Sequence, residues 1–365
     1  PFSMQGADLT LWMTIAIVGF YSAMTLFFVP HMALGAELSV DYHERSRLFG
    51  VRHIFYTLGS ILSLGAMYLL INEEFAEGGN VRLMAREQAL VAIAIMVVLV
   101  IYAVVMLRER PEFQNRQQGG PLQAFTDIWG NPHAKLLIIV TFIEYVGSAA
   151  IAALTLYISQ YVVGAPAMAP LIILAYMIPS TVFVPLWIPL SKRFGKIRVW
   201  MFGMILTGLS FGGMFSLPFI DSVEQRLFWI IVLAAFAGLA AGCGGTLGPS
   251  VQGDVIDYDE YKTGERKEGS YFAAWNFVHK SALGVMLLLT GFVLDFAGFM
   301  PNVEQTMQVK IAMVSLYGLF PLVCYTVGAI LFSRFSLDEK AYEVIRTELD
   351  ARRAKAAEEA DATAQ

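Results

Sequence analysis

The stretch SYFAAWNFVHKSALGVMLLLTGFVLDF, residues 270–296, decides the fold. It is long and apolar enough for a helix that crosses a hydrocarbon core of about 30 Å. Lys280 lies ten residues inside it, which is roughly 15 Å deep at a rise of about 1.5 Å per residue. A cation at that depth costs at least about 2.5–3.5 kcal/mol, and such residues usually mark an ion or substrate path. We therefore expect a membrane protein with a transport function.

The composition extends this expectation to the whole chain. The sequence is 57% hydrophobic and 15% charged, with a mean hydropathy of +0.60, whereas soluble domains are about 25% charged. Apolar runs of membrane-spanning length recur along it. They predict an all-α polytopic bundle of about nine helices, at 9–36, 48–71, 87–107, 134–163, 168–190, 199–217, 226–253, 271–296 and 310–333.

The loop charges orient this bundle. When the loops are assigned to alternate sides, most Lys and Arg residues fall on one side together with the C-terminal tail. The other side holds only Arg82, Arg86, Arg226 and Lys310. By the positive-inside rule, the basic side and the C-terminus face the cytoplasm.

An internal repeat relates two parts of the chain. Asp41-Tyr42-His43-Glu44 matches Asp257-Tyr258-Asp259-Glu260, and each copy follows a long helix interrupted by glycine and proline. Parallel repeats of six helices are one known architecture of transporters. In the second half three predicted helices (134–163, 168–190 and 199–217) precede the long helix of the repeat, whereas in the first half none does. We therefore expect a twelve-helix protein whose first three helices are missing from this sequence. The expected domains are a remnant of the N-terminal half (1–108), a cytoplasmic linker (109–133), a six-helix half (134–335) and a cytoplasmic tail (336–365).

Three motifs carry a family resemblance. They are VPHMALGAELSVDYHERSRLFGVR (29–52), LSKRFGK (190–196) and DVIDYDEYKTGERKEGSYFAAWNFVHK (254–280). Together they resemble the glycoside–pentoside–hexuronide:cation symporters of the major facilitator superfamily, the melibiose permease-like proteins. Two positions depart from melibiose permease: Phe28 stands where that protein has an aspartate, and Gly245 where it has a tryptophan. These departures argue against melibiose as the substrate.

The resemblance implies twelve helices around a central cavity, and sugar uptake driven by sodium or protons. It places Lys280 at the site of the coupling cation and the sugar, with Arg52 lining the same cavity. Trp275 and Asn276 would lie nearby, with Trp275 stacking on the sugar ring. The family's acidic cation-binding pair belongs to its second helix, which this sequence does not contain.

The residues themselves add three candidates. Asn276 lies one turn before Lys280 on the same helix face. Glu144 lies near mid-depth of its span, where a carboxylate suits cation coupling. His31 follows Pro30, where a kink exposes backbone. Four of the candidate residues also have a structural interpretation. Lys280 could form an interhelical ion pair, and Arg52 could be an interfacial arginine. Glu144 and His31 could have packing roles.

A second group of residues suggests a gate. Asp254, Asp257 and Glu260 recur every three residues, so they share one face of a helix near the cytoplasm. Lys262, Arg266 and Lys267 follow closely. We expect a charge network that forms in one access state and breaks in the other, with solvated loop charges as the alternative. In the first copy of the repeat the same role falls to Glu37, Asp41, Glu44, Arg45 and Arg47.

These observations predict a secondary active transporter that carries a sugar with sodium or protons by alternating access. The alternatives are a lipid or lysolipid transporter of the same fold, and a truncated membrane protein that transports nothing. An enzyme is not expected, because the sequence has no nucleophile–base pair, no metal-ligand spacing and no phosphate loop. We expect no cofactor, no metal and no nucleic-acid partner. The expected partners are a small-molecule substrate and membrane lipid, for a monomer in a bacterial inner membrane.

Overall fold

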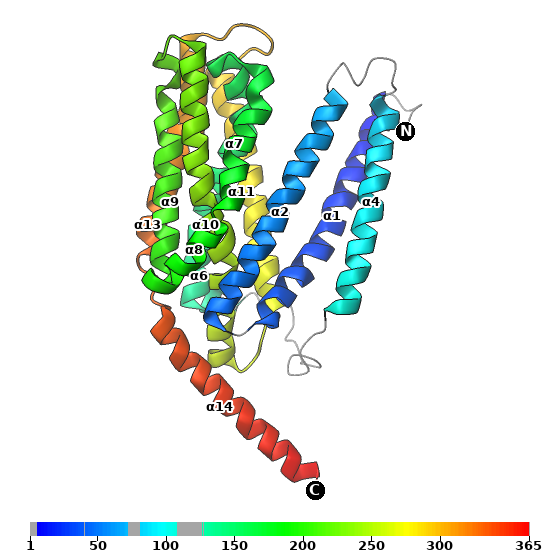
Figure 1. Ribbon diagram of the computed structural model, residues 1–365, viewed down its shortest axis with the longest axis vertical. Coiled ribbons are helices and arrows are strands. Elements are labelled where there is room, and N and C mark those ends of the chain that lie inside the picture. Colours follow the sequence, from blue (N-terminus) through cyan, green and yellow to red (C-terminus); the bar gives the residue numbers. More distant parts are fainter. Residues whose placement is uncertain (1–5, 40, 72–80, 108–125, 127, 365) are drawn as a thin grey trace. The chain divides into compact units, whose positions relative to one another are not determined.

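The computed structural model describes residues 6–39, 41–71, 81–107, 126 and 128–364. Within these ranges the regular elements are helices, and no strand is present (Figure 1). The chain divides into two compact units. Unit 1 contains residues 1–38 and 58–116, and unit 2 contains residues 39–57 and 117–365.

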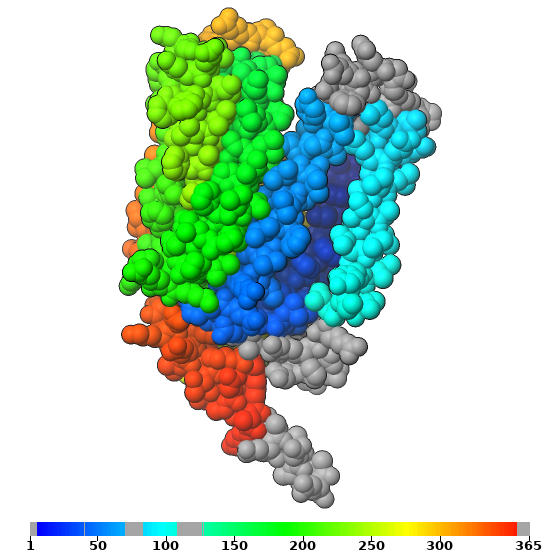
Figure 2. All heavy atoms as spheres, viewed as in Figure 1, coloured from blue at the N-terminus to red at the C-terminus, as the bar shows by residue number. Residues whose placement is uncertain are grey.

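Unit 1 consists of α1 (Gly6–Leu38), the later part of α2 (Tyr42–Ile71) and α4 (Val81–Met106). Its helices expose most of their large apolar side chains, including Leu26 and Val104. They border an open groove of about 1750 Å³, which Figure 2 shows between α2 and α4 with α1 at its floor. His31 lines this groove, and its ring stacks on Phe27 with the ring centroids 5.4 Å apart.

Unit 2 contains the beginning of α2 and the rest of the chain. Its elements are α6 (Pro132–Tyr157), α7 (Ala169–Val182), α8 (Val184–Phe194), α9 (Lys196–Gly213), α10 (Val223–Thr263), α11 (Glu268–Phe296), α12 (Met307–Val314), α13 (Phe320–Phe332) and α14 (Glu339–Ala364). Short π-helices, Ile158–Val163 and Ser315–Leu319, extend α6 and join α12 to α13. The core cluster of this bundle includes Leu154, Phe211, Ala237, Met286 and Met313.

Local sequence explains where several helices of unit 2 begin and end. Asn131 caps α6, because its side-chain oxygen accepts from two backbone N–H groups, and Pro132 occupies the first turn. Pro179 precedes the break at Phe183, where α7 and α8 meet at 50°. Gly264, with φ +74°, ends α10 in the left-handed conformation that glycine adopts readily.

The prediction of a polytopic helical membrane protein is confirmed. Among the described residues, seven helices are long and apolar enough to cross a membrane, or eight if the bent pair α7–α8 is one span. The remaining predicted span, 48–71, is helical as part of α2. This span is not among the seven helices, because polar residues near its start, such as Arg52 and His53, lower its mean hydropathy.

Helix α10 is a continuous 41-residue helix despite its glycines and Pro249. The glycines instead permit close approach by its neighbours. A Cβ on Gly238 would overlap the backbone carbonyl of Tyr176 in α7, and one on Gly242 would lie 2.5 Å from the carbonyl oxygen of Ser180. Glycine removes the side chain where two backbones must meet, so it packs α10 tightly into unit 2.

Candidate functional site

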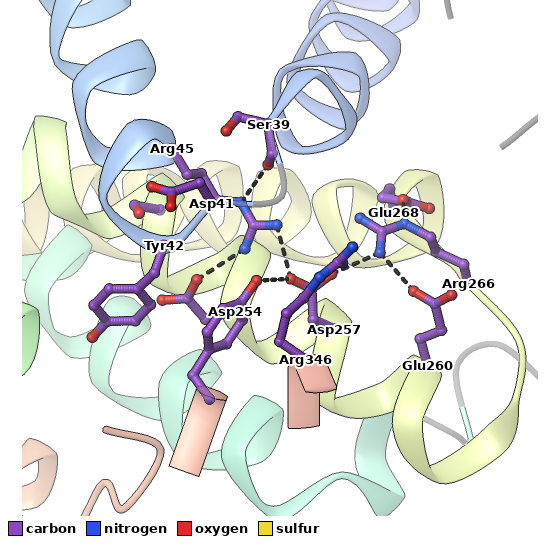
Figure 3. Close-up of polar contacts among 12 residues, drawn as sticks. Ser39, Asp41, Tyr42, Arg45, Asp254, Asp257, Glu260, Arg266, Glu268 and Arg346 are labelled. Carbon is purple, nitrogen blue, oxygen red and sulfur yellow. Dashed lines mark hydrogen bonds and ion pairs between the residues drawn. The ribbon is translucent and has the colours of Figure 1, made fainter. Parts of the chain in front are cut away.

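A buried charge network lies where the beginning of α2 meets the end of α10. Arg45 is fully buried, and its guanidinium reaches two carboxylates of α10 (Figure 3). Nη1 lies 2.9 Å from Oδ1 of Asp254, and Nη2 lies 2.8 Å from Oδ2 of Asp257. Its Nε donates to the carbonyl oxygen of Ser39 at 3.2 Å. The arginine therefore ties the two copies of the repeated motif together.

Two further cations complete the pairing of these carboxylates. Lys196, the first residue of α9, places its Nζ 2.7 Å from Oδ2 of Asp254 and 3.2 Å from the ring centre of Tyr42. Arg266 lies 2.6 Å from both Asp257 and Glu260 and also donates to Glu268.

The C-terminal helix α14 makes further contacts with the network. The hydroxyl of Tyr342 donates to Oδ2 of Asp257 at 2.7 Å, and Arg353 pairs with Glu260 at 2.7 Å. Near its start, Glu339 lies 2.8 Å from Nε2 of His43. The tail is thus part of the site.

Burial and pairing oppose each other in this network. Burial disfavours the charge of Arg266, but the carboxylates of Asp257, Glu268 and Glu260 outweigh it and raise the arginine's pKa. Burial raises the pKa of the Tyr342 hydroxyl, because it disfavours the charged phenolate. The hydroxyl therefore stays protonated and donates. Removing one partner of a buried ion pair leaves an uncompensated charge, which is strongly unfavourable. Loss of one member of the network would therefore destabilise its paired neighbours.

The structure places the other predicted gate residues outside this buried centre. Asp41 caps α2 by accepting from the backbone N–H groups of His43 and Glu44, at 2.9 and 2.7 Å. Glu44 accepts from Ser39, and Arg47 is exposed. Glu37 lies at the end of α1, in unit 1. Arg45, which we expected to act with the first copy of the repeat, pairs with Asp254 and Asp257 of α10.

The predicted substrate residues of unit 2 lie on three helices. Lys280 is exposed on α11, and Asn276 is half-buried one turn earlier. Trp275 is only 3% exposed and packs between Tyr271 and Phe272, so its ring is not available for stacking on a sugar in this structure. Arg52 is half-buried on α2.

Glu144 of α6 lies beside Trp200 of α9 and Gly244 of α10. Its Oε1 and the indole nitrogen of Trp200 each lie 3.4 Å from where a Cβ on Gly244 would be. That indole nitrogen is buried and makes no hydrogen bond of normal geometry. Next to Glu144 on α6, Tyr145 packs edge-on against His279 of α11, with centroids 4.6 Å apart. Glycine at 244 thus leaves room for a carboxylate inside the bundle.

Sequence reasoning missed several residues of these sites. Lys196 was visible only as a member of the basic LSKRFGK loop, and Tyr342 lies in the expected cytoplasmic tail, 336–365. His53, which packs on Gly245, stood beside Arg52 without drawing attention. The described residues form no group of three or more His, Cys, Asp and Glu side chains that could hold a metal ion.

Comparison with known proteins identifies the class. Residues 1–339 match the family described as MFS/sugar transport protein, so the chain belongs to that family. Together with its long apolar helices, this membership defines an integral membrane protein of the major facilitator superfamily.

Among its relatives, the uncharacterized symporter YjmB of Bacillus subtilis is 27% identical, covering 81% of this chain and 62% of that protein. The putative sulfoquinovose importer of Salmonella typhimurium is 27% identical over 64% of this chain and 48% of that one. The human sodium-dependent lysophosphatidylcholine symporter 1 is 25% identical over 93% of this chain and 68% of that one. The chain thus spans from about half to two thirds of these relatives' lengths.

A solved structure shows the same fold. The crystal structure of a variant of the Escherichia coli fucose:proton symporter FucP superimposes with a TM-score of 0.58 at 14% identity, covering 84% of this chain and 73% of that one.

Proposed function

We propose that the protein is a cation-coupled symporter of the glycoside–pentoside–hexuronide kind, which carries a sugar or sugar acid together with sodium or protons. It would work by alternating access, with Lys280 contacting the substrate or replacing the coupling ion. The bacterial inner membrane is its expected location, with the charge network on the cytoplasmic side.

The observation that carries this proposal is the bridge made by Arg45. A single buried guanidinium, one residue after the first copy of the repeat, joins Asp254 and Asp257 of α10, which lie 209 and 212 residues away. A permanent packing contact between two helices is usually apolar, whereas a buried set of ion pairs gives a junction with two discrete arrangements, formed or solvated. Such a junction suits a gate that closes one access path.

The substrate class rests on Lys280 and on the relatives. An exposed ammonium group near the middle of α11 suits an anionic or strongly polar substrate. The putative sulfoquinovose importer is named for a sugar bearing a sulfonate group. A hexuronide or another acidic glycoside is therefore the first substrate to test.

A second candidate is transport of a lysolipid. It is favoured by the human relative, which matches 93% of this chain. Phe28, which stands where melibiose permease has a sugar-binding aspartate, supports the same alternative.

Uptake by the full-length protein in proteoliposomes tests these candidates. We expect radiolabelled glucuronide to accumulate when a sodium or proton gradient is imposed, and Lys280→Ala to reduce the initial rate by more than about tenfold. Lys310→Ala is the matched control, because Lys310 lies at the start of α12, 4.0 Å from the exposed Glu304.

The alternatives predict other results. Accumulation of labelled lysophosphatidylcholine without glycoside uptake would support the lipid carrier. If correctly inserted protein moved neither class under either gradient, the alternative of a membrane protein that transports nothing would replace transport.

A further inference from the structure

Residues 45–57 of α2 and 242–257 of α10 pack along a line that we call the α2–α10 seam. Small and polar side chains make it. The hydroxyls of Ser46 and Ser250 lie 2.9 Å apart, and a Cβ on Gly50 would lie 3.1 Å from Thr246. Close approach along this line therefore depends on residues with little side-chain bulk.

The tightest contact in the seam is between His53 and Gly245. A Cβ on Gly245 would lie no more than 2.9 Å from Nδ1, Cε1 and Cγ of the His53 ring, closer than real Cβ atoms approach other atoms. The imidazole thus occupies the space that any side chain at position 245 would need. His53 in this position and a larger residue at 245 exclude each other.

The surroundings of the ring suit a neutral imidazole. It hydrogen-bonds to the backbone of Ser180 on α7, whereas its Nε2 is buried with no hydrogen-bond partner. A neutral ring has one N–H donor and an imidazolium has two. The closed seam therefore provides an acceptor for one of the two donors that a charged ring would carry.

The charges around His53 point the same way. The charged group that acts on the ring is Arg52 on its own helix. On the packed elements, the groups that contact the ring are Gly245 of α10 and the Ser180 backbone of α7, and neither carries a charge. A second positive charge beside Arg52 is disfavoured while the seam stays closed.

We propose that His53 is a proton-binding residue of the transport cycle, neutral while the α2–α10 seam is closed and protonated at Nε2 from solvent when the seam opens. Because the open state binds the proton more tightly, proton binding favours opening by the same factor. The ordinary pKa of a histidine is about 6.5, so the switch works at physiological pH. The proposal rests on the proposed function, since the seam opens only in a carrier that changes access.

Labelling of a cysteine in the seam tests this without a substrate. Ser250→Cys is introduced into full-length protein whose native cysteines, Cys243 and Cys324, are replaced by alanine. Its rate of reaction with N-ethylmaleimide is measured from pH 8.0 to 5.5 in native membranes. Each rate is divided by that of the denatured protein at the same pH, which removes the effect of thiol ionisation.

We expect the normalised rate to rise about five- to tenfold as the pH falls, because each pH unit below the open-state pKa favours opening up to about tenfold. His53→Gln keeps a side chain of similar size that takes up no proton, so its rate should stay flat. A pH response that survives in His53→Gln, or a flat response with His53 present, overturns the proposal. Uptake assays decide the proposed function separately.

The steric part of the argument has its own test. Gly245→Ala should displace the ring and label fast even at pH 8.0, and adding His53→Ala should restore slow labelling. Gly284→Ala, where a Cβ meets no atom within 4 Å, is the matched control for glycine replacement in a membrane helix. Fast labelling that persists in the double variant contradicts the pairing of His53 with Gly245.

Discussion

Asp257 is the acceptor on which the charge network depends. It is fully buried and accepts from Arg45, Arg266 and Tyr342. We expect Asp257→Ala to reduce the free energy of unfolding by about 3–5 kcal/mol, because it strands buried cations. Glu348→Ala is the control, since its pair with Arg352 is half-exposed and should contribute about 0–1 kcal/mol. Thermal unfolding in detergent measures both, and shifts of equal size would argue against a buried network.

A second residue-scale prediction concerns Asp41 and pH. The backbone N–H of Glu44, despite partial burial of the carboxyl, holds the pKa of Asp41 below its usual range. The carboxylate therefore stabilises the fold above about pH 4, and this contribution is lost as the pH falls through the lowered pKa. Asp41→Asn keeps a good helix cap without the titration. The Tm difference between the two proteins should be constant from pH 7 to 5 and change only below pH 4; a change near pH 6 would point to another group.

Among the elements, α10 owes its position to glycine. We expect Gly238→Ala to lower the Tm by several degrees, because its Cβ would overlap the Tyr176 carbonyl. Gly291→Ala on α11 meets no atom within 4 Å, so it should be neutral or slightly stabilising, given alanine's helix preference of about 1 kcal/mol. Both variants replace a helical glycine by alanine, one at a tight contact and one in open space. Similar Tm values for the two variants would contradict close packing of α7 on α10.

The tail helix α14 should stabilise the charge network. Ending the chain after Leu337 removes Tyr342 and Arg353, which bond to Asp257 and Glu260. Ending it after Lys355 keeps both contacts and serves as the control. We expect the first truncation alone to lower the Tm and to expose the network, measured by maleimide labelling of a cysteine introduced at Ser39. Identical behaviour of the two truncations would show that α14 is dispensable for closure.

Parts of this site could be predicted from the sequence because they are local. The spacing of Asp254, Asp257 and Glu260 defines a helix face without any tertiary information. Their partner Arg45 could not be assigned in this way, since pairing residues 212 apart depends on how α2 docks against α10. The contact of His53 with Gly245 was hidden for the same reason: a glycine in a sequence does not say which neighbour uses its space.

For the whole molecule, hydropathy was a sufficient guide to the helices, because a membrane span must satisfy its backbone within one segment. The compact units contain residues 1–38 with 58–116 and residues 39–57 with 117–365. The expected domain bounds at 108, 133 and 335 stay a prediction. Residues 39–57 of α2 make long-range polar contacts with α10 through Arg45 and Ser46, which chain order alone does not predict.

The orientation of the molecule gives the last prediction. Basic residues concentrate in the loops that hold the charge network and along α14, which places these parts in the cytoplasm by the positive-inside rule. Green fluorescent protein fused after Gln365 should therefore fluoresce, and alkaline phosphatase at the same position should be inactive. Phosphatase inserted after Asp221, between α9 and α10, should be active, because that loop lies at the opposite end of both helices. An active phosphatase at the C-terminus would invert the topology and place the proposed gate on the outer side of the membrane.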